Sequence, residues 1–363
     1  MKSKLIFGSL LAFVAASCAN ASEPSNYSLT VNLTPDEDGS YVYIFDYDTR
    51  AKVDSALVDN GIAKFEGNIT NPFYARLLLD GDRIGDLIIE PATISVSPAT
   101  RSIESDGKLN VKMQEMNSRL MALAQEYRSL PNDSASAARA QKINDEYTSV
   151  LESTLKDNTD NALGYIIFIE TISGNGDLSS FDNMLNEYPQ FADSRRVKSL
   201  RENLVKKEET SVGHKYKDFE ITYDGKTERL SDYVGNDHYT LLDFWASWCG
   251  PCIRETKVIK ELYEKYNGKG LEFLGVAVWD EPENTKKAIE THNLPWHSIL
   301  NAQTIPTDLY GISGIPCIIL IDPEGNIVSR DKQDNDLVSD VDAAMAKFKT
   351  DKESEEKSDN KAE

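Results

Sequence analysis

The chain has 363 residues, more than one hydrophobic core usually holds, so its length favours two or three domains. Its 39 basic and 60 acidic residues give a formal charge of −21, which disfavours binding to nucleic acid. Four cysteines are too few for a disulfide scaffold, so we expect any role they have to be chemical.

Residues 1–21 have the pattern of a secretion signal. Lys2 and Lys4 precede an apolar run, 5–16, that is too short to cross a membrane. Small residues then lead to Cys18, which resembles the end of the lipobox in a bacterial lipoprotein signal, where the cysteine is acylated. Ordinary signal cleavage after Ala21 is the alternative. Both interpretations predict a location in the bacterial cell envelope or periplasm, and the lipoprotein interpretation adds a lipid anchor at Cys18 as the only membrane attachment.

Residues 27–111 are predicted to form a β-rich sandwich or barrel. Short β-type runs alternate there with turn signals such as Asn60-Gly61 and Asp80-Gly81. The segments 58–61 and 89–91 resemble a β-rich domain of unknown function found ahead of thioredoxin-like domains in envelope proteins of Bacteroidota. That family has no established chemistry, so we expect this domain to pack or to dock a partner.

Residues 112–208 change to a helical period. Met116, Leu120 and Leu123 recur at spacings of four and three, and these stripes end after about two heptads, which is too short for a coiled coil. We therefore predict an α-helical spacer. Residues 350–363 carry six acids, three lysines and one apolar residue, a composition that predicts a disordered acidic tail.

The motif that can carry chemistry is Cys249-Gly250-Pro251-Cys252. An apolar β-type run ends just before it, and an amphipathic helical pattern follows it. The unpaired N–H groups and dipole of a helix N-terminus stabilise a thiolate, so Cys249 is predicted to be the nucleophile. Cys252 should be more buried and within reach of the first sulfur. Such a pair can cycle between dithiol and disulfide through a mixed disulfide.

Other interpretations of the motif are a zinc half-site, a haem attachment site and an inert structural disulfide. Zinc needs two further ligands, and only Cys317 and four dispersed histidines remain after the motif and Cys18. Haem attachment needs a histidine where Ile253 stands. A structural disulfide would leave the strand–turn–helix context unexplained. We therefore expect neither a metal nor a cofactor.

The segment Trp248–Cys252 resembles the thioredoxin active-site motif, and Gly314-Ile315-Pro316 resembles the cis-proline loop of that fold. Segments 244–248 and 321–325, with Glu255 after the motif, narrow the resemblance to the TlpA/ResA-like envelope thiol-disulfide oxidoreductases of the redoxin group. The resemblance implies an α/β thioredoxin-like domain over residues 209–349. The chain departs from that family's pattern at Ile253 and Lys257, where Arg and Pro are common, which leaves partner choice open.

The resemblance also implies roles for residues outside the dithiol. Pro316, if cis, would hold its loop against the dithiol and leave backbone groups free to pair with a substrate strand. Asp243 stands where thioredoxin keeps a buried acid, so it is a candidate base for Cys252, although a structural acid is the alternative. Cys317 is either a third thiol or, as we favour, a small buried strand residue. The residues expected to flank the site are Trp248, Gly250, Pro251, Glu255 and Ile315.

The function predicted from these residues is the reduction of protein disulfides. The Gly-Pro pair between the cysteines and Ile315 before the proline resemble thioredoxin, a reductant, and the related family serves cytochrome c maturation or oxidative-stress repair. The expected partners are a disulfide-containing protein and a membrane-embedded thiol electron donor. One alternative is a thiol peroxidase, although Ala246 stands where the T-x-x-C motif of peroxiredoxins has threonine. Another alternative is a non-catalytic envelope binding protein.

Overall fold

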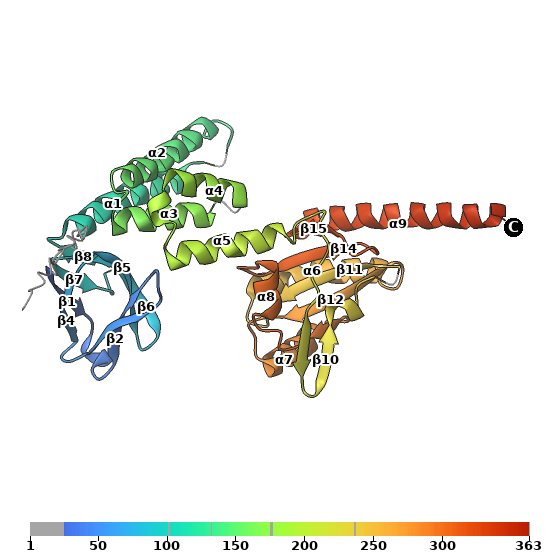
Figure 1. Cartoon of the computed structure of the whole chain (residues 1–363), viewed down its shortest axis with the longest axis horizontal. Coiled ribbons are helices and arrows are strands. Elements are labelled where there is room, and N and C mark those ends of the chain that lie inside the picture. Colours follow the sequence, from blue (N-terminus) through green and yellow to red (C-terminus); the bar gives the residue numbers. More distant parts are fainter. Residues whose placement is uncertain (1–24, 101, 132, 175–176, 236, 363) are drawn as a thin grey trace, which may run out of the picture. The chain divides into compact units, whose positions relative to one another are not determined.

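The computed structural model describes residues 25–100, 102–131, 133–174, 177–235 and 237–362, so the predicted signal and Cys18 lie outside the described residues. The chain divides into two compact units, one ending at Thr171 and the other beginning at Ile172 (Figure 1). In the part that the structure describes, no helix is long and apolar enough to span a membrane.

The first unit contains two four-stranded sheets, in the strand orders β4-β1-β7-β8 and β3-β2-β5-β6. Alternate residues such as Val42 and Ile44 in β2, and Leu29 and Val31 in β1, are buried in a shared core. The predicted β-rich domain is therefore confirmed. The strands are β1 (Ser25–Asn32), β2 (Tyr41–Asp46), β3 (Lys52–Leu57), β4 (Ile62–Ile69), β5 (Phe73–Leu79), β6 (Asp82–Ile89), β7 (Thr93–Ser97) and β8 (Ser102–Ser105).

A buried carboxylate joins this β-rich part to the first helix. Glu90, directly after β6, accepts hydrogen bonds from the backbone N–H groups of Leu109 (3.0 Å) and Asn110 (2.8 Å) in the first turn of α1. These N–H groups have no partner within the helix, and the negative charge favours the positive end of its dipole. Glu90, part of the segment 89–91 discussed above, thus binds the N-terminus of the first helix. The helices that follow are α1 (Lys108–Ser129), α2 (Ala137–Lys156) and α3 (Ala162–Gly174).

The second unit is built on a five-stranded sheet in the order β13-β12-β11-β14-β15. The central strand β11 pairs in parallel with β12 and antiparallel with β14. This is the predicted thioredoxin-like architecture, and in the sequence helices follow the β-rich part and precede this sheet, as expected. The strands are β9 (Glu220–Tyr223), β10 (Lys226–Arg229), β11 (Tyr239–Trp245), β12 (Leu271–Ala277), β13 (His297–Ile299), β14 (Cys317–Ile321) and β15 (Ile327–Arg330); the helices are α4 (Leu178–Glu187), α5 (Arg195–Glu208), α6 (Gly250–Tyr266), α7 (Pro282–His292), α8 (Ile305–Tyr310) and α9 (Asp334–Ala362).

Side chains of β11 alternate between two cores, one on each face of this sheet. Leu241 and Trp245 pack in a cluster with α6 and α9, whereas Leu242 and Phe244 pack in a second cluster with β9 and α8. All seven residues of β11 are buried, as expected for a central strand covered on both faces. The alternation also decides which side chains face the helix that bears the dithiol motif.

Helix α5 is held against α8 and the end of β15. The Arg330 guanidinium donates to the carbonyl oxygens of Thr210 (2.7 Å) and Tyr310 (2.8 Å), close to the C-terminal ends of α5 and α8. Gly311, at φ 62°, lies so close to α5 that a Cβ atom there would be 2.2 Å from the carbonyl oxygen of Asn203. Glycine is therefore required at 311 for both conformation and contact.

The C-terminal segment differs from its prediction. Helix α9 continues to Ala362, through residues for which we predicted a disordered tail, so that prediction is wrong for residues 350–362. The composition of residues 350–362 excludes their burial in a core, but it does not exclude a helix. Glu, Lys and Ala have high helix propensity, and opposite charges recur in this segment at spacings of three and four.

Candidate active site

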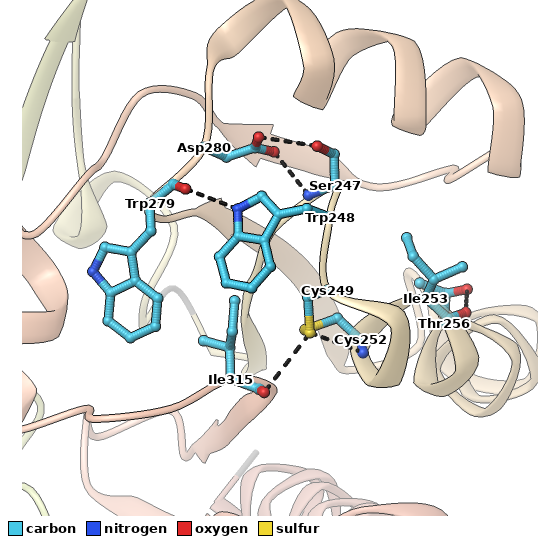
Figure 2. The surroundings of a disulfide bond; sticks show 9 residues. All are labelled: Ser247, Trp248, Cys249, Cys252, Ile253, Thr256, Trp279, Asp280 and Ile315. Carbon is cyan, nitrogen blue, oxygen red and sulfur yellow. Dashed lines mark hydrogen bonds between the residues drawn. A yellow bond between two sulfur atoms is a disulfide. The ribbon is translucent and has the colours of Figure 1, made fainter. Parts of the chain in front are cut away.

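Cys249 and Cys252 form a disulfide at the N-terminus of α6 (Figure 2). The chain leaves β11 at Trp245, turns through a hydrogen bond from Cys249 N–H to the Ala246 carbonyl (3.1 Å), and enters the helix at Gly250. Cys249 is the N-cap residue, and its Sγ accepts a hydrogen bond from the backbone N–H of Cys252 (3.1 Å). The sulfur therefore occupies the position where a helix stabilises negative charge.

The two cysteines differ little in burial, with exposed fractions of 4% for Cys249 and 1% for Cys252. By contrast, the neighbouring Trp248 is 60% exposed, and Pro251 is also exposed. Gly250 and Pro251 fill the first two helical positions, where proline is tolerated because its missing N–H would have no helical partner. These exposed residues thus lie on either side of the buried Cys249 in the sequence.

The loop before β14 lies against the disulfide. The Ile315–Pro316 peptide bond is cis, and the Ile315 carbonyl oxygen is 3.7 Å from Sγ of Cys249 (Figure 2). Pro316 directly precedes Cys317, the first residue of β14, which pairs with Phe244 of β11. The sheet register thus brings two segments far apart in sequence to the same sulfur atom.

Two buried carboxyl groups accompany the disulfide. The alternation of β11 places Asp243 on the same face of the sheet as Trp245 and α6, and its exposed fraction is 3%. Burial raises the pKa of Asp243 to about 7, and the charge of Glu255 adds to this rise. Oδ1 of Asp243 has no hydrogen-bond partner among the residues that the structure describes. An acid in this condition is poised to exchange a proton near neutral pH.

Glu255, on α6 one turn after Cys252, is 4% exposed. Its Oε1 accepts a hydrogen bond from the backbone N–H of Asp334 (2.9 Å), at the start of α9. Burial raises the pKa of Glu255, the hydrogen bond opposes that rise, and the nearby Asp334 charge adds to it. Glu255 therefore both connects α6 to α9 and supplies a charge that acts on Asp243.

Cys317 lies in a different core cluster from the disulfide. It belongs to the cluster on the opposite face of the sheet, with Phe244 and Ile319, whereas Cys249 and Cys252 belong to the α6 cluster. The Cys317 thiol donates to Oδ1 of Asp331 (3.1 Å), and burial, with Asp331 second, raises its pKa well above the usual value. A raised pKa disfavours the thiolate, the reactive form of a cysteine.

The structure adds residues that the sequence did not single out for a role. Ser247 donates to the Asp280 carboxylate through its N–H (2.7 Å) and its hydroxyl (2.9 Å), and the Trp248 indole N–H donates to the Trp279 carbonyl (2.9 Å). Within the described ranges, no three His, Cys, Asp or Glu side chains gather in a way that would hold a metal ion.

Comparisons with known proteins agree with this geometry. Residues 212–330 match the AhpC/TSA family, and residues 27–117 match a domain of unknown function, DUF4369. The chain is 33% identical over 124 residues to the thiol-disulfide oxidoreductase ResA of Geobacillus thermodenitrificans, an alignment that covers 34% of this chain and 70% of that protein. ResA of Geobacillus kaustophilus gives the same identity and coverage.

Several solved structures also resemble the chain, among them two from Bacteroides. One is the thioredoxin domain of a thiol-disulfide oxidoreductase from Bacteroides vulgatus, at 30% identity and a TM-score of 0.33, covering 37% of this chain and 96% of that one. The other is a thiol:disulfide interchange protein from Bacteroides sp., at 32% identity and a TM-score of 0.34, covering 38% of this chain and 91% of that one.

Proposed function

The chain belongs to the family of thiol-disulfide oxidoreductases that includes ResA, and from this we propose that it reduces protein disulfides through Cys249 and Cys252. The observation that carries the proposal is the disulfide at the N-terminus of α6, with the Ile315 carbonyl beside Cys249 and a buried acid of raised pKa on the same face of the sheet. An enzyme of this family acts on a thiol or disulfide group, and the acidic surface disfavours nucleic acid as a partner.

The first step is attack of the Cys249 thiolate on a disulfide of the client protein. A bond forms between Cys249 Sγ and one client sulfur, the client S–S bond breaks, and the second client sulfur leaves as a thiolate that takes up a proton. The helix N-terminus favours the Cys249 thiolate. The backbone beside Pro316 would pair with the extended client segment and align its disulfide.

The second step resolves the mixed disulfide. Cys252 gives its proton to the Asp243 carboxylate and attacks Cys249 Sγ. The Cys249–Cys252 disulfide forms, the bond between Cys249 and the client breaks, and the client sulfur that was bound to Cys249 leaves as a thiolate. Two electrons have then passed from the dithiol to the client, and the enzyme is left in the oxidised form that the structure shows. A thiol donor must reduce it before the next cycle.

The location follows from the signal-like segment. We assign the chain to the bacterial cell envelope, with an acylated Cys18 as its membrane attachment and a membrane-embedded thiol protein as its electron donor. In that compartment, protein disulfides arise that a reductase must reopen, for cytochrome c maturation or for repair after oxidation. The β-rich domain would dock one of the two partners.

A single-turnover assay tests the proposal. One equivalent of reduced protein is mixed with insulin, and the loss of insulin disulfide is followed together with the appearance of the Cys249–Cys252 disulfide. We expect both in the wild type, neither in Cys249→Ser, and a trapped mixed disulfide in Cys252→Ser. Absence of electron transfer from the wild type would contradict the proposal.

The match to the AhpC/TSA family makes thiol peroxidase the second candidate. The same reduced protein is therefore mixed with hydrogen peroxide. We expect peroxide to be consumed much more slowly than insulin is reduced, because Ala246 leaves the position of the peroxidatic threonine without a hydroxyl group. Faster consumption of peroxide than of insulin disulfide would reverse the assignment.

A further inference from the structure

Asp280 is a buried carboxyl group that takes no part in the two proposed steps of disulfide reduction. It lies between β12 and α7 with an exposed fraction of 4%. It accepts three hydrogen bonds, from Ser247 N–H (2.7 Å), Ser247 hydroxyl (2.9 Å) and Thr285 hydroxyl (2.8 Å). Burying a carboxylate is costly unless such bonds compensate, so this arrangement is built around the acid.

The neighbouring residue makes a second connection to the same turn. The Trp279 carbonyl accepts the indole N–H of Trp248, so residues 279 and 280 hold residues 247 and 248, directly before Cys249 (Figure 2). Because Trp248 is 60% exposed, packing alone does not fix its ring. Three hydrogen bonds from residues 247 and 248 to residues 279 and 280 therefore hold the turn by which the chain enters α6.

Two neighbouring loops, the one after β12 that makes these contacts and the one after β13 that binds it, contain residues in an uncommon conformation. Trp279, Asn301 and Gln303 have φ values of 53°, 58° and 50°, in the left-handed region that non-glycine residues seldom occupy. The Gln303 side-chain amide donates to the Asp280 carbonyl (2.8 Å) and to Asn301 Oδ1 (2.9 Å). Strain of this kind persists where surrounding bonds enforce it, and it is common beside functional sites.

We propose that Asp280 is a positioning residue for the attacking thiolate. Asp280 binds Ser247 and so holds Cys249 Sγ at the N-terminus of α6. Trp279 binds Trp248 and so holds its exposed ring beside Cys249, where a client disulfide would bind. The role is geometric, because the carboxylate accepts its hydrogen bonds from Ser247 and Thr285 and makes none with either cysteine sulfur among the described residues. The inference rests on the proposed function of Cys249.

The test compares Asp280→Ala with Asp280→Asn. The asparagine oxygen can accept from Ser247 N–H and Thr285, and its amide can donate to the Ser247 hydroxyl, so the geometry is kept without the charge. Two quantities are measured: kcat/KM for disulfide reduction, and the pH midpoint of Cys249 alkylation in the reduced protein. We expect Asp280→Ala to lower kcat/KM about tenfold and to raise the alkylation midpoint, and Asp280→Asn to stay within about threefold of wild type.

Asp322 provides a matched control. It is also a buried aspartate of this unit, 8% exposed, and it accepts two hydrogen bonds from Asn326 in the turn between β14 and β15, at the opposite end of β14 from Pro316. Asp322→Ala should lower the melting temperature while leaving both measured quantities unchanged. Ser247→Ala, which removes only one of the three bonds to Asp280, should lower kcat/KM by about threefold and serves if Asp280→Ala does not fold.

Two results would overturn the inference: equal effects of Asp280→Ala and Asp322→Ala on the alkylation midpoint and kcat/KM, or an Asp280→Asn variant as impaired as Asp280→Ala. A wild-type protein that fails to reduce disulfides would contradict the proposed function instead. In that case the alkylation midpoints still decide whether Asp280 positions Cys249.

Discussion

Asp243 and Glu255 are two buried carboxyl groups on the side of the sheet where α6 packs, and the charge of Glu255 raises the pKa of Asp243. Burial is the main reason that the pKa of Asp243 rises to about 7, and Glu255 adds to the rise. The acid that we assign as proton acceptor is thus tuned by a residue on the same helix as the two cysteines. This relationship makes the proton step testable separately from the sulfur chemistry.

Replacing Asp243 with asparagine should slow disulfide reduction at pH 7 by about 10–100-fold, because Cys252 loses its proton acceptor while the side-chain volume is kept. Turnover of insulin by the variant and the wild type would measure this. The rate of Cys249 alkylation is the control, since the first step does not use Asp243. Full activity of the variant from pH 6 to 8 would show that Asp243 is a structural acid.

The same substitution should stabilise the fold in a pH-dependent way. The pKa of Asp243 is raised from its usual value of 3.8, so the folded state binds the proton more tightly, and the resulting stability is lost as pH rises from about 4 through about 7. Asp243→Asn removes this dependence. The free energy of unfolding of the variant should exceed that of the wild type by on the order of a few kcal/mol at pH 8, and by less at pH 5. Denaturant titrations at both pH values would measure it.

Glu255→Gln should shift the acid limb of the pH–rate profile to lower pH. Asp243 accepts a proton only when ionised, and loss of the Glu255 charge lowers its pKa, so the ionised form persists to lower pH. The glutamine oxygen can still accept from Asp334 N–H, so the link between α6 and α9 is kept. Activity at pH 7 should stay within about threefold of wild type. An acid limb that stays in place or moves upward would contradict the coupling.

Cys317→Ala should leave insulin reduction within a factor of about two of the wild type, because this thiol lies on the other face of the sheet and is protonated against Asp331. Cys252→Ser, which blocks resolution, is the active-site comparison. A large loss of activity at unchanged melting temperature would place Cys317 in the reaction.

The Cys249 thiol of the reduced protein should have a pKa below the ordinary value of about 8.5, since it caps a helix and accepts the Cys252 N–H. The rate of iodoacetamide alkylation as a function of pH would give the midpoint. A midpoint at or above that value would remove the helix terminus as the source of reactivity.

Acylation of Cys18 should be visible as incorporation of labelled palmitate into the wild type and not into Cys18→Ala. The lipobox-like segment is the reason for this expectation. A mature N-terminus at Ser22, found by mass spectrometry, would show ordinary secretion instead.

Local sequence identified the central elements of the redox unit because each carries a strong signal. The apolar run of β11, the Cys249–Cys252 spacing and the β-type alternation near Val42 each specify an element within a few residues. The Asp280–Ser247 contact was not predictable in this way. It joins residues 33 positions apart, and nothing local distinguishes a buried aspartate after a strand from an exposed one. For residues 350–362, composition predicts that the segment cannot form a core, but it does not distinguish a solvated helix from a coil.

The position of α5 has a consequence for how this enzyme can be divided and recombined. The AhpC/TSA match begins at residue 212, and the boundary inferred from sequence is at 209, yet Arg330 at the far end of that segment donates to Thr210, and Gly311 is shaped to the backbone of α5. A fragment that begins at 209 keeps Thr210 but lacks α5, so the backbone that Gly311 contacts would be missing. We therefore expect a redox fragment, or a fusion that joins it to another N-terminal domain, to need α5 from Arg195 onward.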